Sequence, residues 1–326
     1  MKKQIKNTLR LIHVIFSQFL IFQNTLKEYI SFNKLKKINK NKFNVELKEN
    51  DLFFIEKTWI SFHDEIVKDT NNLSYLFFNQ PSLIKTMTAD SFFGEYKPFL
   101  EKSLESFNYK EIKKLLKENS IGGPRILLNS IFTTNFKFSS VTRAVHIYQL
   151  SKIQNIFKNE NLKNPKTIIE WGGGYGGLCN VFYKHYGFDE STYIIIDIPV
   201  SIKIQYYYLA TIYGSENINI FEDNNQIQSG KINLVRLSEL ENLNCKCDIF
   251  ISSWAISESN KISQDFVLKK YFYDALYTIL FHQEKSKTHP YAEYLSEIMK
   301  DKYEVIDSDN VPVFENQHYL ITKNKN

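Results

Sequence analysis

Apolar residues in the first half of the chain recur at helical spacing. Segments 52–69 and 141–158 carry them every three or four positions, which predicts two amphipathic helices. Between them, 109–119 has the same period, and Asn108 with Glu111 three residues later forms a capping-box signature at its start. This half is therefore expected to be helical.

From residue 166 onward, short β-branched runs alternate with helical stretches. Such alternation is typical of a mostly parallel sheet with right-handed crossovers. Only a short connection separates the last two runs, so they are expected to form an antiparallel hairpin at the sheet edge. We predict a helical region, 1–160, and a Rossmann-like α/β domain, 161–326. The seven expected strands are 166–171, 191–197, 231–235, 247–253, 275–281, 303–307 and 318–322.

The N-terminal segment 1–22 has basic residues followed by an apolar run. His13, Ser17 and Gln18 interrupt the run, no small-residue cleavage site follows, and the run is too short to span a bilayer. Its helical spacing predicts an amphipathic helix rather than a signal peptide or a transmembrane segment. Peripheral contact with a membrane or a partner is compatible with this pattern.

Composition excludes some classes of function. The 326 residues carry a formal net charge of only +5 without a basic stripe, which argues against nucleic-acid binding. The three cysteines cannot form a disulfide framework, and Cys245 and Cys247 lack the second pair of ligands that a zinc site needs. These features fit a reducing, cytoplasmic environment.

The segment IIEWGGGYGG, 168–177, places glycines directly after the first expected strand. Ligands of such sheets bind beyond the carboxyl ends of the strands, where bare glycines let the backbone approach closely. Gly172, Gly174 and Gly177 fit the dinucleotide pattern G-x-G-x-x-G. Glu170 also makes the segment fit E-x-G-x-G-x-G.

Glu170 discriminates between these two patterns. A carboxylate about 5 Å from a pyrophosphate costs roughly 3 kcal/mol at an effective dielectric near 20. The same carboxylate attracts a ligand that carries an ammonium and a sulfonium group. S-adenosylmethionine is such a ligand, so Glu170 favours it over a nicotinamide dinucleotide.

The segments IIEWGGGYGGLC, YIIIDIP and DIFISSWAISES resemble a known family. They are similar to motifs of class I S-adenosylmethionine-dependent methyltransferases. More narrowly, they resemble the sugar O-methyltransferases found with bacterial surface-polysaccharide genes. The likeness covers roughly 139–323 and implies a seven-stranded methyltransferase sheet. The helical region would then form a lid that binds the acceptor.

The resemblance also implies roles for individual residues. Glu170 would hold the methionine end, the glycine loop would pass under the methionine and ribose, and Asp197 would accept the ribose hydroxyls. Ser238 would lie near the adenine. The implied cofactor-binding residues are Glu170, Gly172, Gly173, Gly174, Tyr175, Gly176, Asp197, Ser238, Ser252 and Ser253.

Transfer of a methyl group to a hydroxyl needs a group that removes the proton. His282 ends the fifth expected strand and is the preferred base, because histidine titrates near neutrality. Glu258 is a second candidate, as base or as acceptor anchor, and His289 is a lesser one. His146 is interpreted as a core residue. A divalent metal ion is an alternative to a side-chain base, although no paired-acid motif requires one.

The expected function is O-methylation of a sugar or sugar nucleotide, a glycan precursor of a capsule or lipopolysaccharide. Other small nucleophiles, such as a phosphoramidate or a polyketide-type hydroxyl, remain alternative acceptors. An NAD(P)-dependent oxidoreductase and a non-catalytic relic of the fold are the rival classes. The sequence leaves open the oligomeric state and which hydroxyl is methylated.

Overall fold

The computed structural model describes most of the chain. The described residues are 25–40, 42–88, 97–126, 139–160, 164–188, 191–224 and 226–324. The amphipathic helix predicted within 1–22 lies outside them. None of the described helices combines the length and the apolar character needed to cross a bilayer. Cys179, Cys245 and Cys247 are free thiols.

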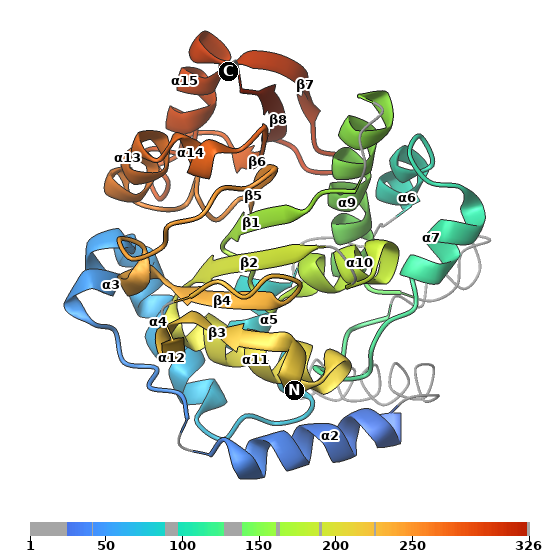
Figure 1. Cartoon of the computed structure of the whole chain (residues 1–326), viewed down its shortest axis with the longest axis vertical. Coiled ribbons are helices and arrows are strands. Elements are labelled where there is room, and N and C mark those ends of the chain that lie inside the picture. Colours follow the sequence, from blue (N-terminus) through green and yellow to red (C-terminus); the bar gives the residue numbers. More distant parts are fainter. Residues whose placement is uncertain are drawn as a thin grey trace, which may run out of the picture.

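An eight-stranded sheet forms the centre of the described structure (Figure 1). Its spatial order is β3-β4-β2-β1-β5-β6-β8-β7. All neighbours run parallel except β8, which is antiparallel to both β6 and β7. The strands are β1 (Thr167–Trp171), β2 (Thr192–Asp197), β3 (Ile218–Ile220), β4 (Ile232–Arg236), β5 (Ile249–Ser253), β6 (Tyr277–Gln283), β7 (Glu304–Asn310) and β8 (Gln317–Lys323).

The predicted fold class is confirmed, with one correction to the strand count. All seven expected strands form, and the last two make the expected antiparallel hairpin at one edge. The eighth strand, β3, pairs with β4 at the opposite edge and has only three residues. Such a short segment has no period that a sequence pattern could reveal.

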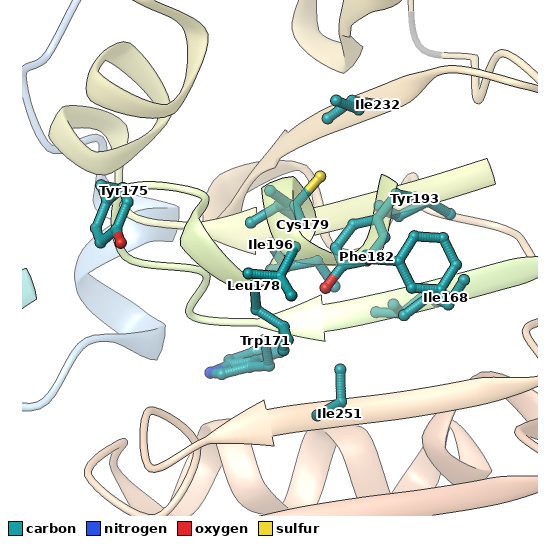
Figure 2. Packing of buried hydrophobic residues seen from close by; sticks show 14 of the residues in the cluster. Ile168, Trp171, Tyr175, Leu178, Cys179, Phe182, Tyr193, Ile196, Ile232 and Ile251 are labelled. Atoms are coloured by element: carbon teal, nitrogen blue, oxygen red, sulfur yellow. The ribbon is translucent and has the colours of Figure 1, made fainter. Parts of the chain in front are cut away.

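Helices connect the strands and cover the sheet. They are α9 (Val141–Asn159), α10 (Gly177–Tyr186), α11 (Pro199–Tyr213), α12 (Phe221–Asn224), α13 (Lys261–Lys269), α14 (Tyr271–Asp274) and α15 (Tyr294–Lys302). Helix α10 follows the glycine loop, and its residues Leu178, Cys179 and Phe182 lie over β1 and β2 (Figure 2). This packing fixes the glycine loop between a buried strand and a buried helix.

The N-terminal region is helical, as predicted. Its described helices are α2 (Thr25–Ile38), α3 (Glu49–Phe54), α4 (Lys57–Thr70), α5 (Pro81–Met87), α6 (Lys97–Ser103) and α7 (Tyr109–Leu115). The capping box of α7 is confirmed, because the Glu111 N–H donates to Asn108 Oδ1 at 3.0 Å and Glu111 Oε2 accepts from the Asn108 N–H at 2.8 Å. Buried side chains of these helices and of the sheet form one continuous hydrophobic cluster.

The single helix expected over 52–69 is wrong, because the chain breaks it into α3 and α4. Ile55 and Glu56 are extended between the two. Side chains from the start of α13 satisfy the carbonyls at the break: Asn260 Nδ2 donates to the Ile55 carbonyl at 3.3 Å, and Ser263 Oγ to that of Phe54 at 2.6 Å. Contacts across about 200 residues of sequence therefore override the helical period.

Candidate active site

A cavity of about 510 Å³ opens at the carboxyl ends of β1, β2, β5 and β6. The glycine loop after β1 and the end of β2 line one side. Helix α9, the loops after β5 and β6, and helices α4 and α5 of the N-terminal region supply the remaining walls. The sequence predicted a ligand site at this edge of the sheet.

The glycine loop has a backbone that only glycine adopts readily. Gly172 and Gly174 have φ values of +75° and +56°. A Cβ at Gly172 would lie 1.9 Å from Ala255 Cβ, so that glycine is required for packing. A Cβ at Gly174 would meet nothing within 4 Å, and Gly174 lines the cavity. A side chain at Gly174 would therefore project into space that a ligand could use.

Glu170 lies beneath this loop and is 2% exposed. Its Oε2 accepts from the Tyr193 hydroxyl at 2.9 Å and would be 3.1 Å from a Cβ at Gly173. Burial raises the pKa of the Glu170 carboxyl to about 8, against the lowering effect of the Tyr193 hydrogen bond, and the nearby Asp197 adds to the rise. Within the described residues, no cationic side chain pairs with Glu170.

Asp197 ends β2 and also lines the cavity. Its Oδ2 accepts from the Gly174 N–H at 3.1 Å and from Gln205 Nε2 at 2.8 Å, while Oδ1 accepts from the Ile198 N–H at 2.8 Å. Burial raises the pKa of Asp197 to about 7, and these hydrogen bonds oppose the rise. Asp197 therefore braces the glycine loop and the backbone just before α11 while it lines the cavity.

Helix α9 presents one face to the cavity through Thr142, Val145, His146 and Gln149. Their spacing of three, four and seven residues places them on a single stripe. His146, interpreted from the sequence as a core residue, is thus a wall residue. Its ring centre lies 5.7 Å from that of Tyr175, and burial with the nearby Arg143 charge lowers its pKa to about 3.

The opposite wall comes from the loops after β5 and β6. Ser253 lines the cavity from the end of β5, and Trp254 and Glu258 from the loop that follows. Gln283 and His289 line it from the end of β6 and the loop after that strand. Burial raises the pKa of the Glu258 carboxyl, and the nearby His289 counteracts this rise. Ser253 and Glu258 therefore lie at the cavity, where the sequence analysis expected them.

His282, the preferred base, does not line the cavity. The fifth expected strand is β6, which extends to Gln283. Neighbouring residues of a strand point to opposite faces of the sheet. Gln283 therefore faces the cavity, whereas the His282 ring lies 5.5 Å from the ring of His318 on β8. Burial lowers the pKa of His282 to about 4. The prediction chose the right strand and the wrong face.

Three predicted cofactor residues, Gly176, Ser238 and Ser252, also lie outside the cavity wall. A Cβ at Gly176 would lie 2.9 Å from Leu209 Cδ1, so this glycine packs against α11. Ser252 is fully buried, donating from Oγ to the Trp171 carbonyl at 3.0 Å and accepting from the Ile256 N–H at 2.9 Å. The Ser238 N–H donates to Asp51 Oδ1 at 2.9 Å, and its neighbour Leu237 lines the cavity instead. Both serines hold the backbone in place.

Several buried polar atoms of the wall have no hydrogen-bond partner. Buried polar atoms in proteins are normally paired, so unpaired ones at a cavity indicate groups that a ligand would satisfy. Sequence reasoning missed the three glutamines among them, because Gln149, Gln283 and Gln317 come from α9, β6 and β8 and share no local pattern. They are His146 Nδ1, Gln149 Nε2 and Oε1, Ser253 Oγ, Trp254 Nε1, Gln283 Nε2, His289 Nδ1 and Gln317 Oε1.

No protein-family model and no curated protein matches the sequence. Solved structures resemble part of the fold. A SAM-dependent methyltransferase from Aquifex aeolicus is 16% identical over 52% of this chain and 87% of its own, with a TM-score of 0.37. A SAH-bound methyltransferase from Podospora anserina is 13% identical over 56% of this chain and 82% of its own, with a TM-score of 0.38. Fibrillarin from Aeropyrum pernix, with natively bound S-adenosyl-L-methionine, is 13% identical over 49% of this chain and 67% of its own, with a TM-score of 0.35.

Proposed function

We propose that this protein is an S-adenosylmethionine-dependent methyltransferase. The observation that carries the proposal is a buried carboxyl without a cationic partner, Glu170, under a glycine loop that opens into the cavity. A ligand with an ammonium group would supply that partner. When bound, S-adenosylmethionine supplies a methyl group on a cationic sulfur, which needs no further activation.

The cavity residues fit this cofactor. Glu170 would face its cationic end, and Gly174 leaves open the space that a Cβ would fill. Asp197 lines the cavity, and its carboxyl would face the vicinal hydroxyls of the ligand, which would compete with its present donors. Leu237 would lie where the adenine is expected.

Glu170 disfavours a dinucleotide for a different physical reason from the charge repulsion expected from the sequence. With a pKa of about 8, the Glu170 carboxyl is mostly protonated at pH 7, so it repels a pyrophosphate only weakly. Glu170 favours a cationic ligand over an anionic one because only the cationic ligand gains an ion pair. A cationic ligand favours the carboxylate and forms an ion pair with it, whereas an anionic ligand keeps the carboxyl neutral.

For the acceptor we propose a hydroxyl of a sugar or sugar nucleotide, which the motif resemblance implies. Gln149, Gln283 and Gln317 support this choice, because each brings an unpaired amide atom to the cavity. Amides donate and accept without carrying charge, and they suit an acceptor rich in hydroxyl groups. The N-terminal helices would complete this side as a lid, since Trp59 and Lys85 line the cavity.

Calorimetry on the full chain tests the cofactor. S-adenosylmethionine and its demethylated product are expected to bind and to raise the melting temperature. At a ligand concentration of 100 times the dissociation constant, binding adds about 2.7 kcal/mol to the free energy of unfolding. NAD⁺ and NADP⁺ are expected to do neither. Binding of a nicotinamide dinucleotide without any response to the two sulfur nucleosides would overturn the proposal.

A further inference from the structure

Three side chains from distant parts of the chain lie at the cavity wall. Trp59 comes from α4, Glu258 from the loop after β5, and His289 from the loop after β6, and all three line the cavity. Trp59 Nε1 donates to Glu258 Oε2 at 3.2 Å. A helix of the N-terminal region thereby fixes a carboxyl group of the α/β domain.

The backbone around His289 is well anchored. Its N–H donates to Ser286 Oγ at 3.1 Å, and its carbonyl accepts from the N–H groups of Ser286 at 3.2 Å and of Ala292 at 3.3 Å. The imidazole ring lacks a hydrogen bond at Nδ1, which is buried and has no partner. The imidazole is thus held at the cavity with a nitrogen that a ligand or a water molecule could engage.

Glu258 and His289 interact electrostatically without a direct ion pair within 4.0 Å. Other ionisable groups line the same cavity, so the pair does not titrate in isolation. Those groups are Glu56, Lys85, His146, Glu170 and Asp197. The nearby His289 and the Trp59 hydrogen bond both favour the ionised form of Glu258.

The remaining histidines near the sheet are less suited to accept a proton. His146 sits beside the glycine loop, where a Cβ at Gly177 would lie 2.1 Å from its ring, and its pKa of about 3 makes protonation unfavourable. His282 lies on the other face of β6. His289 combines access to the cavity with a neighbouring carboxyl.

We propose that His289 is the general base of the acceptor site and that Glu258, held by Trp59, is its positioning residue. This inference rests on the proposed methyl transfer. The acceptor oxygen bonds to the methyl carbon while the carbon–sulfur bond breaks and its electron pair stays on sulfur. The hydroxyl proton passes to an imidazole nitrogen of His289, and the Glu258 carboxylate stabilises the resulting imidazolium.

Activity of matched variants tests the two roles. The probe is methyl-labelled S-adenosylmethionine with a mixture of UDP-glucose, UDP-galactose and GDP-mannose. We expect His289→Asn to lower kcat by about 10²–10⁴-fold, and Glu258→Gln by a smaller factor. The double variant should be no slower than His289→Asn, because residues that act as a unit are not additive. His282→Asn is the control and should stay within a few-fold of wild type.

A spectroscopic readout separates a base from a structural histidine without any acceptor. In NMR spectra of ring-labelled histidine at a fixed pH, Glu258→Gln should shift the His289 ring resonances, because a nearby negative charge is lost. The His282→Asn variant should leave those resonances in place. Unmoved His289 resonances in Glu258→Gln would overturn the positioning role.

Failure of this inference is distinguishable from failure of the proposed function. If wild type does not bind S-adenosylmethionine in calorimetry, the proposed function falls and the base assignment falls with it. If the cofactor binds to all variants equally and His289→Asn keeps its kcat, only the base assignment is wrong. A large loss in Glu258→Gln with little loss in His289→Asn would make Glu258 the base instead. A wild type that binds the cofactor but methylates none of the three sugar nucleotides would overturn the acceptor site as described.

Discussion

The two halves of the cavity are built in opposite ways. The half beneath the glycine loop comes from one stretch of chain, Glu170 to Gln205, and its polar atoms mostly bond to one another. The other half gathers side chains from Trp59 to Gln317, and many of its polar atoms have no partner. The first half is therefore formed by the fold itself, whereas the second depends on a ligand to satisfy it.

This difference separates two kinds of recognition. A preorganised loop braced by its own hydrogen bonds loses little entropy when a ligand binds. A wall of unpaired amides carries a desolvation cost in the free protein, which a ligand with matching hydroxyls would relieve. We expect cofactor binding to be sensitive to backbone changes and acceptor binding to side-chain chemistry.

The largest effect is expected from a side chain on the glycine loop. Gly174→Val should weaken S-adenosylmethionine binding by at least about 100-fold, or ~2.8 kcal/mol, because the side chain fills ligand space. Gly187→Val is the matched control, since Gly187 also has positive φ (+80°) and no atom within 4 Å of its Cβ, but lies away from the cavity. Calorimetry on both variants separates blockage from backbone strain. Equal losses in the two would mean that strain alone is responsible.

The next largest effect is expected in the half of the cavity beneath the glycine loop, where ligand binding should change the protonation of Glu170. Glu170, with a pKa of about 8, is mostly neutral in the free protein at pH 7, and a cationic ligand favours its ionised form. Binding should therefore release a proton, and affinity should rise with pH, by up to about tenfold per unit, until the pH reaches the free pKa.

Calorimetry in buffers of different ionisation heat, between pH 5.5 and 7.5, measures that release. Glu170→Gln should largely abolish the part of the release that comes from this residue. Asp197 can contribute too, because burial raises its pKa to about 7. Unchanged release in Glu170→Gln would remove Glu170 from the ligand contact.

The smallest effect is expected in the other half of the cavity, from a substitution of Gln149. This substitution should weaken binding of the acceptor but stabilise the protein. Gln149 is fully buried, and neither of its amide atoms has a partner. Gln149→Leu should raise the acceptor KM by about 2–12-fold, the equivalent of a hydrogen bond of ~0.5–1.5 kcal/mol. It should also raise the melting temperature, because an unsatisfied buried amide is removed.

Gln205→Leu is the matched substitution in the half of the cavity beneath the glycine loop. The Gln205 amide donates to the Gly174 carbonyl at 2.9 Å and to Asp197. Gln205→Leu should therefore lower the melting temperature and weaken the cofactor, with little direct effect on the acceptor KM. Thermal unfolding and steady-state kinetics of the pair check both signs. A destabilised Gln149→Leu variant would show that Gln149 has a structural role.

The sequence predicted more of the cavity residues beneath the glycine loop than of the other half of the cavity. Glu170, Gly174 and Asp197 lie together at the cavity as expected, because strand ends and the connecting turn are set by neighbouring residues. His282 was misplaced because the fifth strand runs two residues further than its apolar pattern, to Gln283. A shift of one residue exchanges the two faces of a strand.

What the sequence by itself determined are the features that residues within a few positions of each other control. Helical and strand periods, the capping box at Asn108 and the glycines that need positive φ belong to this class. Only the tertiary structure decided that Trp59 reaches Glu258 across 199 residues of sequence. Such contacts follow from how helices and sheet close over one core, and no local period encodes which side chains then face each other.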